Sequence, residues 1–519
     1  MKKLLLLLLV TMLGMSSVNA QRYLTPQFTA VTKTRVVYGT NYTVLAVPVV
    51  GRTLRQPLQA DLYVPEGDTA TKRPVVIYLI TGNFLPRVTR TAASGALKDS
   101  AAVEIATRMA KMGYVALVCE YRLGWNPVSQ IQEVRVNTLI NAAYRGIQDA
   151  RTAIRYMKSK AADYKIDTSK IILWGQGTGG YISLAAAGLD SYQKAYTTTK
   201  PVGKFFGSNG LPMVIEQSQG FYINGDVEGK ILGRVPPGVT GPPPAGDTLN
   251  LPNHVEFGSK FQMCVNMGGA IGDSSWIDKN TPPIVSFQTP YDLFAPYGSA
   301  VLTVPVSPTV ALPIVEVQGA QAVAERVDQL GLNKGFDKLK AASDPYKTLQ
   351  ASRNGGKYLS GLLPMYGDTI TDSSPWEFFD QNDTLTKYAK IGNPRISAAK
   401  ARLYIDSIIT FVAPRACVAL QLPCASLVST TEELLTAENT KLVVAPNPAQ
   451  KYVAFESDVY NPIQSIDVFD LSGRSVFQAR NIKNHFYQMD RGSLPNGLYI
   501  AKVKFEGGIL TKKIVLEQQ

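Results

Sequence analysis

Between about residue 30 and residue 320, the sequence alternates short apolar runs with segments of helical spacing. The clearest apolar runs are RPVVIYLITG, YVALVCEYRL, KIILWG, FQMCVNMGGAI, PPIVSFQTPYD and ALPIVEVQG. A long helical stripe is formed by Ala143, Ile147, Ala150, Ile154 and Met157. Strands that are apolar on both faces are typical of a parallel sheet covered by helices on both sides. We therefore predict an α/β fold for this region.

The rest of the chain divides into parts of different character. Residues 21–424 are expected to form the α/β domain, with a Pro- and Gly-rich insertion near 222–253 that we interpret as a lid or cap. Residues 425–441 read as a linker. Residues 442–519 alternate apolar and polar residues between regular turn signals, which predicts a small β-sandwich.

The first twenty residues, MKKLLLLLLVTMLGMSSVNA, have a basic start, a leucine run and a small-residue end. This pattern is typical of a secretory signal peptide at residues 1–20. The apolar run is shorter than the roughly 20 residues that span a bilayer, and no later stretch is long enough. We therefore expect an exported protein without a transmembrane segment.

Composition argues against several functions. The net charge of +13 comes from scattered lysines and arginines without a basic run, so we expect no nucleic-acid partner. Two distant histidines and four cysteines do not form a metal-site pattern, and GQGTGG lacks the lysine of a phosphate-binding loop. We expect no metal and no cofactor. Cys417 and Cys424 lie close together and could form a disulfide after export, whereas Cys119 and Cys264 are expected as buried thiols.

The C-terminal region resembles the type A sorting domain of the type IX secretion system. The matching segments are APNP, VFDLSGRSV, LPNGLYIAKV and TKKIVL, which together cover nearly all of residues 442–519. The resemblance implies passage through the periplasm of a Gram-negative bacterium, contact with the secretion machinery, and release or attachment at the cell surface. The open alternative is a carbohydrate-binding sandwich module.

The region from about 35 to 320 resembles an α/β-hydrolase of the carboxylesterase–lipase type. The matching segments are EYRLGWNP, AAYRGIQDARTAIRY, YKIDTSKIILWGQGTGGYISL and PPIVSFQTPYDLFAPY. In that family a serine at the tip of a strained strand-to-helix turn acts as nucleophile, a histidine takes its proton, and an acid orients the histidine.

The tip of the turn is Gly177 in this sequence, so the nucleophile position is vacant. Thr178 carries a hydroxyl one residue past the tip, which makes it a weaker candidate nucleophile; its backbone N–H matches the family's oxyanion donor. Thr81, Gly82 and Asn83 occupy the other oxyanion segment, where esterases commonly have His-Gly-Gly.

The remaining triad positions differ in how well they are kept. Asp292 matches the place of the acid, either as a relic or as a turn-capping residue. No histidine occurs between residues 255 and 484. His485 belongs to the C-terminal region, and His254 precedes the strand around Cys264, where we expect a lid or packing role.

Loss of two triad members predicts a non-catalytic protein with a binding or structural role at the cell surface, because losing one member alone costs roughly 10⁴- to 10⁶-fold in rate. The inherited pocket or its cap would carry this role, and the candidate ligands are a small molecule, an ester or a glycan. The alternative is an active carboxylesterase or lipase with an unconventional nucleophile. A third hypothesis is a self-assembling structural protein of the cell surface.

Overall fold

The computed structural model describes residues 22–90, 92–305, 310–339, 344–369, 372–380, 382–392, 395–424, 440–458, 462–505 and 508–518. The expected signal peptide at residues 1–20 and residues 425–439 of the expected linker lie outside the described residues. The chain divides into two compact units, Met1–Leu427 and Val428–Gln519, each of which is described by itself.

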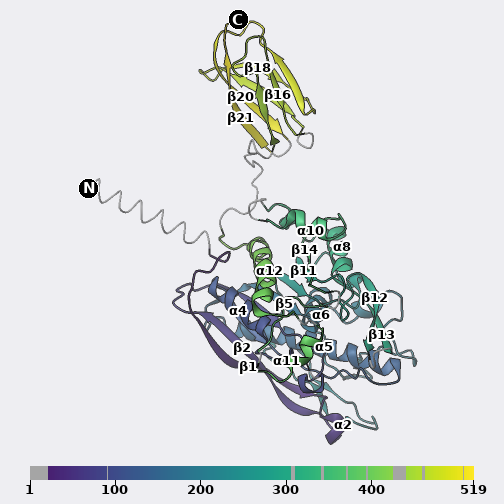
Figure 1. Ribbon diagram of the computed structural model, residues 1–519. Helices are drawn as coiled ribbons and strands as arrows, with labels where there is room; N and C mark the ends of the chain where they lie inside the picture. Colours follow the sequence, from purple (N-terminus) through teal and green to yellow (C-terminus); the bar gives the residue numbers. More distant parts are fainter. Residues whose placement is uncertain are drawn as a thin grey trace. The chain divides into compact units, whose positions relative to one another are not determined.

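The larger unit is built on an eight-stranded sheet (Figure 1). The first two strands in spatial order form an antiparallel hairpin that pairs antiparallel with the third, and all later pairs are parallel. This arrangement confirms the predicted α/β class. In spatial order the strands are β1 (Val31–Thr43), β2 (Leu54–Pro65), β4 (Val115–Cys119), β3 (Arg73–Leu79), β5 (Ile166–Gln176), β10 (Met263–Met267), β11 (Ile284–Gln288) and β14 (Leu362–Pro364).

Helices cover both faces of this sheet. The crossover from β3 to β4 runs toward one edge of the sheet, whereas those from β4 to β5, β5 to β10 and β11 to β14 run toward the other. Because such crossovers are right-handed, the first helix lies on one face and the later ones on the opposite face. These helices are α4 (Ser100–Lys111) on the first face, and α5 (Gln132–Ser159), α6 (Thr178–Gly188) and α8 (Ala320–Leu330) on the second. The last long helix, α12 (Ala398–Ala419), packs on α4 through the Arg402–Glu104 ion pair at 3.3 Å.

Shorter elements lie in the connections between these strands and helices. The short helices are α2 (Val47–Val50), α3 (Arg87–Arg90), α7 (Lys194–Thr197), η1 (Ser274–Trp276), α9 (Lys334–Asp337), α10 (Lys347–Arg353) and α11 (Thr386–Gly392). The short strands are β6 (Gln217–Ser218), β7 (Phe221–Tyr222), β8 (Gly233–Arg234) and β9 (Thr248–Asn250), and the pair β12 (Ser299–Pro305) and β13 (Ala311–Gln318) forms a separate antiparallel hairpin.

A buried ion pair ties the long helix α5 to the segment that follows β4. Asp149 accepts hydrogen bonds from the Arg122 backbone N–H at 2.8 Å and from its Nε at 2.9 Å, and both side chains are fully buried. Arg122 also donates to the Leu249 carbonyl at 2.8 Å. The pair therefore also anchors the insertion 222–253.

Further guanidinium groups of α5 hold the insertion along the helix. Arg151 donates to the Val227 carbonyl at 2.7 Å, and Arg155 donates to the Glu228 carbonyl at 2.5 Å. The insertion is thus held against α5 by hydrogen bonds from buried arginines to several backbone carbonyls of the insertion.

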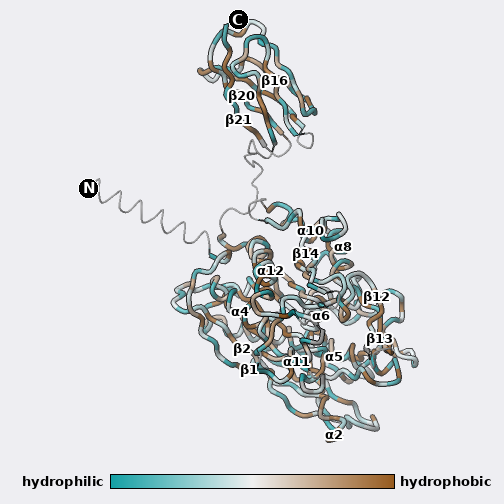
Figure 2. Tube along the Cα trace, in the orientation of Figure 1, coloured by the Kyte–Doolittle hydropathy of each residue, from teal (hydrophilic) through white to brown (hydrophobic). Residues whose placement is uncertain are grey.

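The smaller unit is a β-sandwich of a three-stranded and a four-stranded antiparallel sheet. One buried cluster draws Phe455 from the first sheet and Val468 and Val503 from the second. The alternation of apolar and polar residues along its strands, expected from the sequence, is visible on β20 in Figure 2. The strands are β15 (Val443–Ala445), β16 (Tyr452–Glu456), β17 (Ser465–Phe469), β18 (Ser475–Ala479), β19 (Phe486–Asp490), β20 (Gly497–Phe505) and β21 (Gly508–Leu516).

Candidate functional site

A cavity of about 610 Å³ lies at the carboxyl ends of the parallel strands. Segments that follow β3, β5, β10, β11 and β14 all contribute residues to its lining. The carboxyl ends of parallel strands meet at one edge of a sheet, which is where α/β proteins bind their ligands. The hairpin β12–β13 and helix α5 form further walls. Of the insertion 222–253, expected as a lid, only Val227 lines the cavity.

Gly177 is the tip of a sharp turn between β5 and α6. Its backbone has φ 54° and ψ −119°, a conformation that costs a residue with a side chain about 1–3 kcal/mol. Its N–H donates to the Met267 carbonyl at 2.7 Å, which fixes the turn against β10. The strained turn of the hydrolase family is therefore present, with glycine at its tip.

The space beside this tip is already filled. A β-carbon added to Gly177 would collide with Thr81 Oγ1 and lie 2.9 Å from Thr81 Cβ. Non-bonded carbon atoms pack at about 3.5–4.0 Å, so no side chain fits here without a shift of Thr81. The hydroxyl of Thr81 thus stands where the side chain of a nucleophile at position 177 would begin.

The hydroxyl of Thr178 is engaged in two hydrogen bonds. It accepts from the Asn83 backbone N–H at 3.1 Å and contacts the Tyr121 hydroxyl at 2.7 Å. Tyr121 donates its own proton to the Ile80 carbonyl at 3.0 Å, so Thr178 is the donor in the contact between the two hydroxyls. The buried Thr178 side chain therefore ties α6 to the loop after β3. The role of its backbone N–H as an oxyanion donor stays a prediction.

Asp292 lies close to the turn, as the resemblance implies for the family's acid. A β-carbon built on Gly268, which follows Met267, would come 3.5 Å from Asp292 Oδ2. Oδ1 accepts hydrogen bonds from the backbone N–H groups of Phe294 at 2.8 Å and Ala295 at 3.1 Å. Desolvation outweighs these bonds and raises the pKa of Asp292 to about 7. No ion pair of Asp292 occurs among the described residues.

The segment after β14, where the family carries its histidine, brings acidic and hydroxyl groups to the cavity. Glu377 accepts a hydrogen bond from Gln176 Nε2 at 2.6 Å, and Tyr78 donates its hydroxyl proton to the same amide's oxygen. Burial raises the pKa of Asp372, a shift that the charge of Lys400 partly opposes. No histidine is present among the described residues that line the cavity.

His254 lies elsewhere in the larger unit. Its Nε2 is 3.1 Å from the Tyr38 carbonyl on β1, and its ring centroid is 5.6 Å from that of Tyr156 on α5. His254 is not among the residues that line the cavity. Its contacts are those of a packing residue.

The structure brings most of the residues singled out from the sequence to one site. Those that line the cavity are Thr81, Asn83, Gly177, Thr178 and Asp292. Gly82, which stands between Thr81 and Asn83 in the chain, is not among the lining residues. The expected disulfide is formed near the end of α12, between Cys417 and Cys424. Within the described residues no cluster of His, Cys, Asp and Glu side chains has the makings of a metal site.

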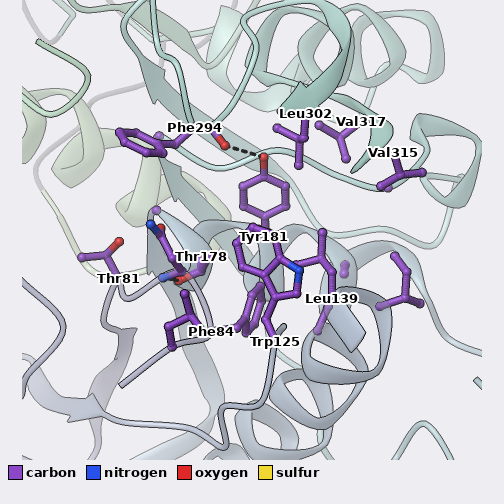
Figure 3. A pocket seen from close by; sticks show the side chains of 18 of the residues that line it. Thr81, Phe84, Trp125, Leu139, Thr178, Tyr181, Phe294, Leu302, Val315 and Val317 are labelled. Carbon is purple, nitrogen blue, oxygen red and sulfur yellow. Dashed lines mark hydrogen bonds between the residues drawn. The ribbon is translucent and has the colours of Figure 1, made fainter. Parts of the chain in front are cut away.

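Other residues of the site were not predicted. Glu377 and Asp372 line the cavity. Their position in the chain after the last strand of the sheet was the sequence feature from which a place at the cavity could have been inferred. Trp376 of the same segment is fully buried, while Phe379 lines the cavity. Tyr181 crosses the cavity and donates to the Phe294 carbonyl at 2.9 Å (Figure 3).

Each of the two units contains a segment that matches a known family. Residues 60–209 match the family model BD-FAE, and residues 443–517 match the secretion system C-terminal sorting domain. No curated protein matches the chain. The sorting domain indicates export through the type IX secretion system to the surface or the exterior of a Gram-negative bacterium. Among the described residues, no helix has the length and apolarity needed to cross a membrane.

The chain is also similar to solved structures of an esterase and of an α/β-hydrolase enzyme. Thermogutta terrifontis esterase 2, phosphorylated by paraoxon, is 13% identical over 70% of this chain and 92% of its own, with a TM-score of 0.34. MGS-M1, an α/β-hydrolase enzyme from a Medee basin deep-sea metagenome library, is 14% identical over 52% of this chain and 73% of its own, with a TM-score of 0.26. The family matches confirm both resemblances seen in the sequence: the chain carries a BD-FAE α/β-hydrolase domain, matched over residues 60–209, followed by a secretion system C-terminal sorting domain, matched over residues 443–517.

Proposed function

We propose that this exported protein binds an apolar small molecule in its inherited hydrolase cavity and does not hydrolyse esters. The observation that carries this proposal is the contact between two segments at the turn: Thr81 occupies the space that a nucleophile at Gly177 would need. Glycine adopts the strained backbone of the turn freely, and no catalytic oxygen is attached to it.

The other parts of a covalent mechanism support the same conclusion. Nucleophilic catalysis by a hydroxyl needs a base within about 2.6–3.2 Å that takes its proton. The proton of Thr178 is donated to Tyr121, and the described lining of the cavity contains no histidine. Asp292 is left beside the turn without a histidine to orient.

A turnover assay tests this proposal. The purified secreted protein is incubated with p-nitrophenyl butyrate, with a serine esterase as positive control and Thr81→Ala and Thr178→Ala as variants. We expect release of p-nitrophenol at the rate of buffer alone for all three forms. Turnover by the parent protein that either variant abolishes would contradict the proposal and name the nucleophile.

One observation favours a second candidate, an esterase with Thr81 as its nucleophile. The Thr81 hydroxyl stands at the tip of the turn, faces the cavity, and makes no hydrogen bond to another described residue. The assay distinguishes the two functions, because only this candidate predicts activity that is lost in Thr81→Ala and kept in Thr178→Ala.

A further inference from the structure

The walls of the cavity are apolar over most of their surface. Figure 3 shows Leu302, Val315 and Val317 of the β12–β13 hairpin on one side and Trp125 and Leu139 on the other, with the ring of Tyr181 between them. The volume of about 610 Å³ falls within the roughly 300–1,000 Å³ of sites for small organic ligands. Further apolar side chains in the lining are Phe84, Ile140, Ile147, Leu189, Phe205, Val214, Trp276 and Phe294.

The hairpin wall is fixed in place. Arg135 of α5 donates from Nη2 to the Pro313 carbonyl at 2.9 Å, and Gln132 donates to the Ile314 carbonyl at 2.9 Å. These bonds join the start of α5 to β13, the strand that carries Val315 and Val317. The apolar part of the cavity is therefore bounded on two sides by elements that are bonded to each other.

The ionisable acidic groups in the described lining of the cavity are not matched by basic ones. Asp292, Asp372 and Glu377 line it, and the described lining contains no lysine, arginine or histidine. The other two carboxylates have nearby polar partners: Asp372 is close to Lys400, and Glu377 accepts a hydrogen bond from Gln176. The Oδ2 atom of Asp292 accepts no hydrogen bond from another described residue.

Because the described lining carries carboxylates and no basic side chain, the polar end of an apolar ligand decides whether it fits the cavity. A ligand carboxylate or phosphate placed beside Asp292 would put two anions in a desolvated site, where like charges cannot both stay ionised without cost. An alcohol or amine can instead donate a hydrogen bond to a carboxylate oxygen, which satisfies both groups. The chain of the ligand would then lie between α5 and the hairpin.

We propose that the cavity takes an elongated apolar molecule that ends in a hydrogen-bond donor, an alcohol or an amine, and that Asp292 receives this end. The inference rests on the proposed binding function and narrows its ligand class. It excludes fatty acids and other apolar anions as preferred ligands.

Titration calorimetry with three probes of equal chain length tests the inference: decanol, decylamine and decanoate, each added to the full secreted protein near pH 8. We expect decanol and decylamine to bind. Decanoate should bind at least about tenfold more weakly, a difference of about 1.4 kcal/mol in binding free energy. The Asp292→Asn variant should lose most of this discrimination. Asp328→Asn, which replaces an exposed aspartate of α8, should keep it.

The outcomes separate this inference from the proposed function. Decanoate that binds as tightly as decanol, an unchanged preference in Asp292→Asn, or no binding of any probe would overturn the inference. None of the probes is an ester, so these results leave the absence of hydrolysis untouched. Ester turnover would contradict the proposed function even if the preference among probes held.

Discussion

Thr81 and Gly177 are a complementary pair: the side chain of Thr81 fills the volume that a β-carbon at Gly177 would occupy. The two residues belong to the segments that follow β3 and β5, which are neighbouring parallel strands. The absence of a side chain at the tip of the turn is therefore matched by the packing of a second loop against it. We therefore expect that a serine placed at the tip alone, without a change at Thr81, would not form a catalytic turn.

The first prediction concerns Gly177→Ser. We expect this variant to unfold at lower urea concentration, with a loss of about 1–3 kcal/mol from backbone strain and a further loss from the collision with Thr81. In a Thr81→Gly background the same change should cost less, since the collision is removed, and a double-mutant cycle measures the difference. Equal costs in both backgrounds would show that the two residues do not compete for space.

The second prediction concerns the hydroxyl of Thr178. Thr178→Val keeps the size of the side chain but leaves the Asn83 N–H and the Tyr121 hydroxyl without this partner. Loss of such buried hydrogen bonds costs about 1–3 kcal/mol of unfolding free energy. Thr34→Val, at an exposed position of β1, serves as the matched control and should change stability little. If both variants were equally stable, Thr178 would not tie the two segments together.

The third prediction concerns the ion pair beneath α5. Asp149→Ala leaves the fully buried Arg122 guanidinium without its carboxylate, a change that costs about 3–5 kcal/mol in comparable sites. The control is Asp163→Ala, because Asp163 pairs with Lys160 while its side chain is 59% exposed. Exposed pairs are worth about 0–1 kcal/mol. Chemical denaturation should therefore separate the two variants clearly, and similar midpoints would argue against a structural role for the buried pair.

Much of the fold could be predicted because its inner strands are buried and mostly apolar. β3, β4, β10 and β11 are buried along their whole length, and each leaves a predominantly apolar run in the sequence. β14 was not predicted, since its three residues, Leu362–Pro364, are too few to form a pattern. The sandwich could be predicted from alternation, which persists along β20 because one face is buried and the other exposed.

The site was harder to predict than the fold. Gly177 and Asp292 could be placed at the carboxyl edge of the sheet because each follows an apolar strand, and both line the cavity. The roles expected for them stay predictions. The contact of Thr81 with Gly177 depends on the separation of two loops in space, which no local pattern encodes. Leu302 and Val315 belong to the β12–β13 hairpin. Its apolar residues are of the same kind as those of a strand in the central sheet, so the sequence alone does not show that they form a wall of the cavity. The insertion 222–253 carries a loop-like composition, but buried arginines of α5 hold it against the helix.

The fourth prediction concerns pH. Because the folded-state pKa of Asp292 is about 7 and its ordinary value is 3.8, the folded state holds a proton that the unfolded chain releases between these values. The free energy of unfolding therefore falls as pH rises from about 4 to 7. Above about pH 7 the fold bears the full cost of burying the ionised carboxylate of Asp292. Burial raises the pKa of Asp372 in the same direction.

Thermal unfolding of Asp292→Asn at several pH values measures this cost. The variant should gain stability over the parent near pH 8, by an amount on the order of 1–4 kcal/mol, and show little gain near pH 4. Asp328→Asn should follow the parent at every pH. A gain that is the same at both ends of the range would contradict the assigned titration of Asp292.

The central claim is that the turn at Gly177 offers no activated oxygen for covalent catalysis. Intact-mass spectrometry of the secreted protein after incubation with a fluorophosphonate probe tests it most directly, with a serine esterase labelled in parallel. The account predicts an unchanged mass for this protein under conditions that label the control completely. A mass increase of one probe, mapped by peptide sequencing to Thr81 or Thr178, would contradict it.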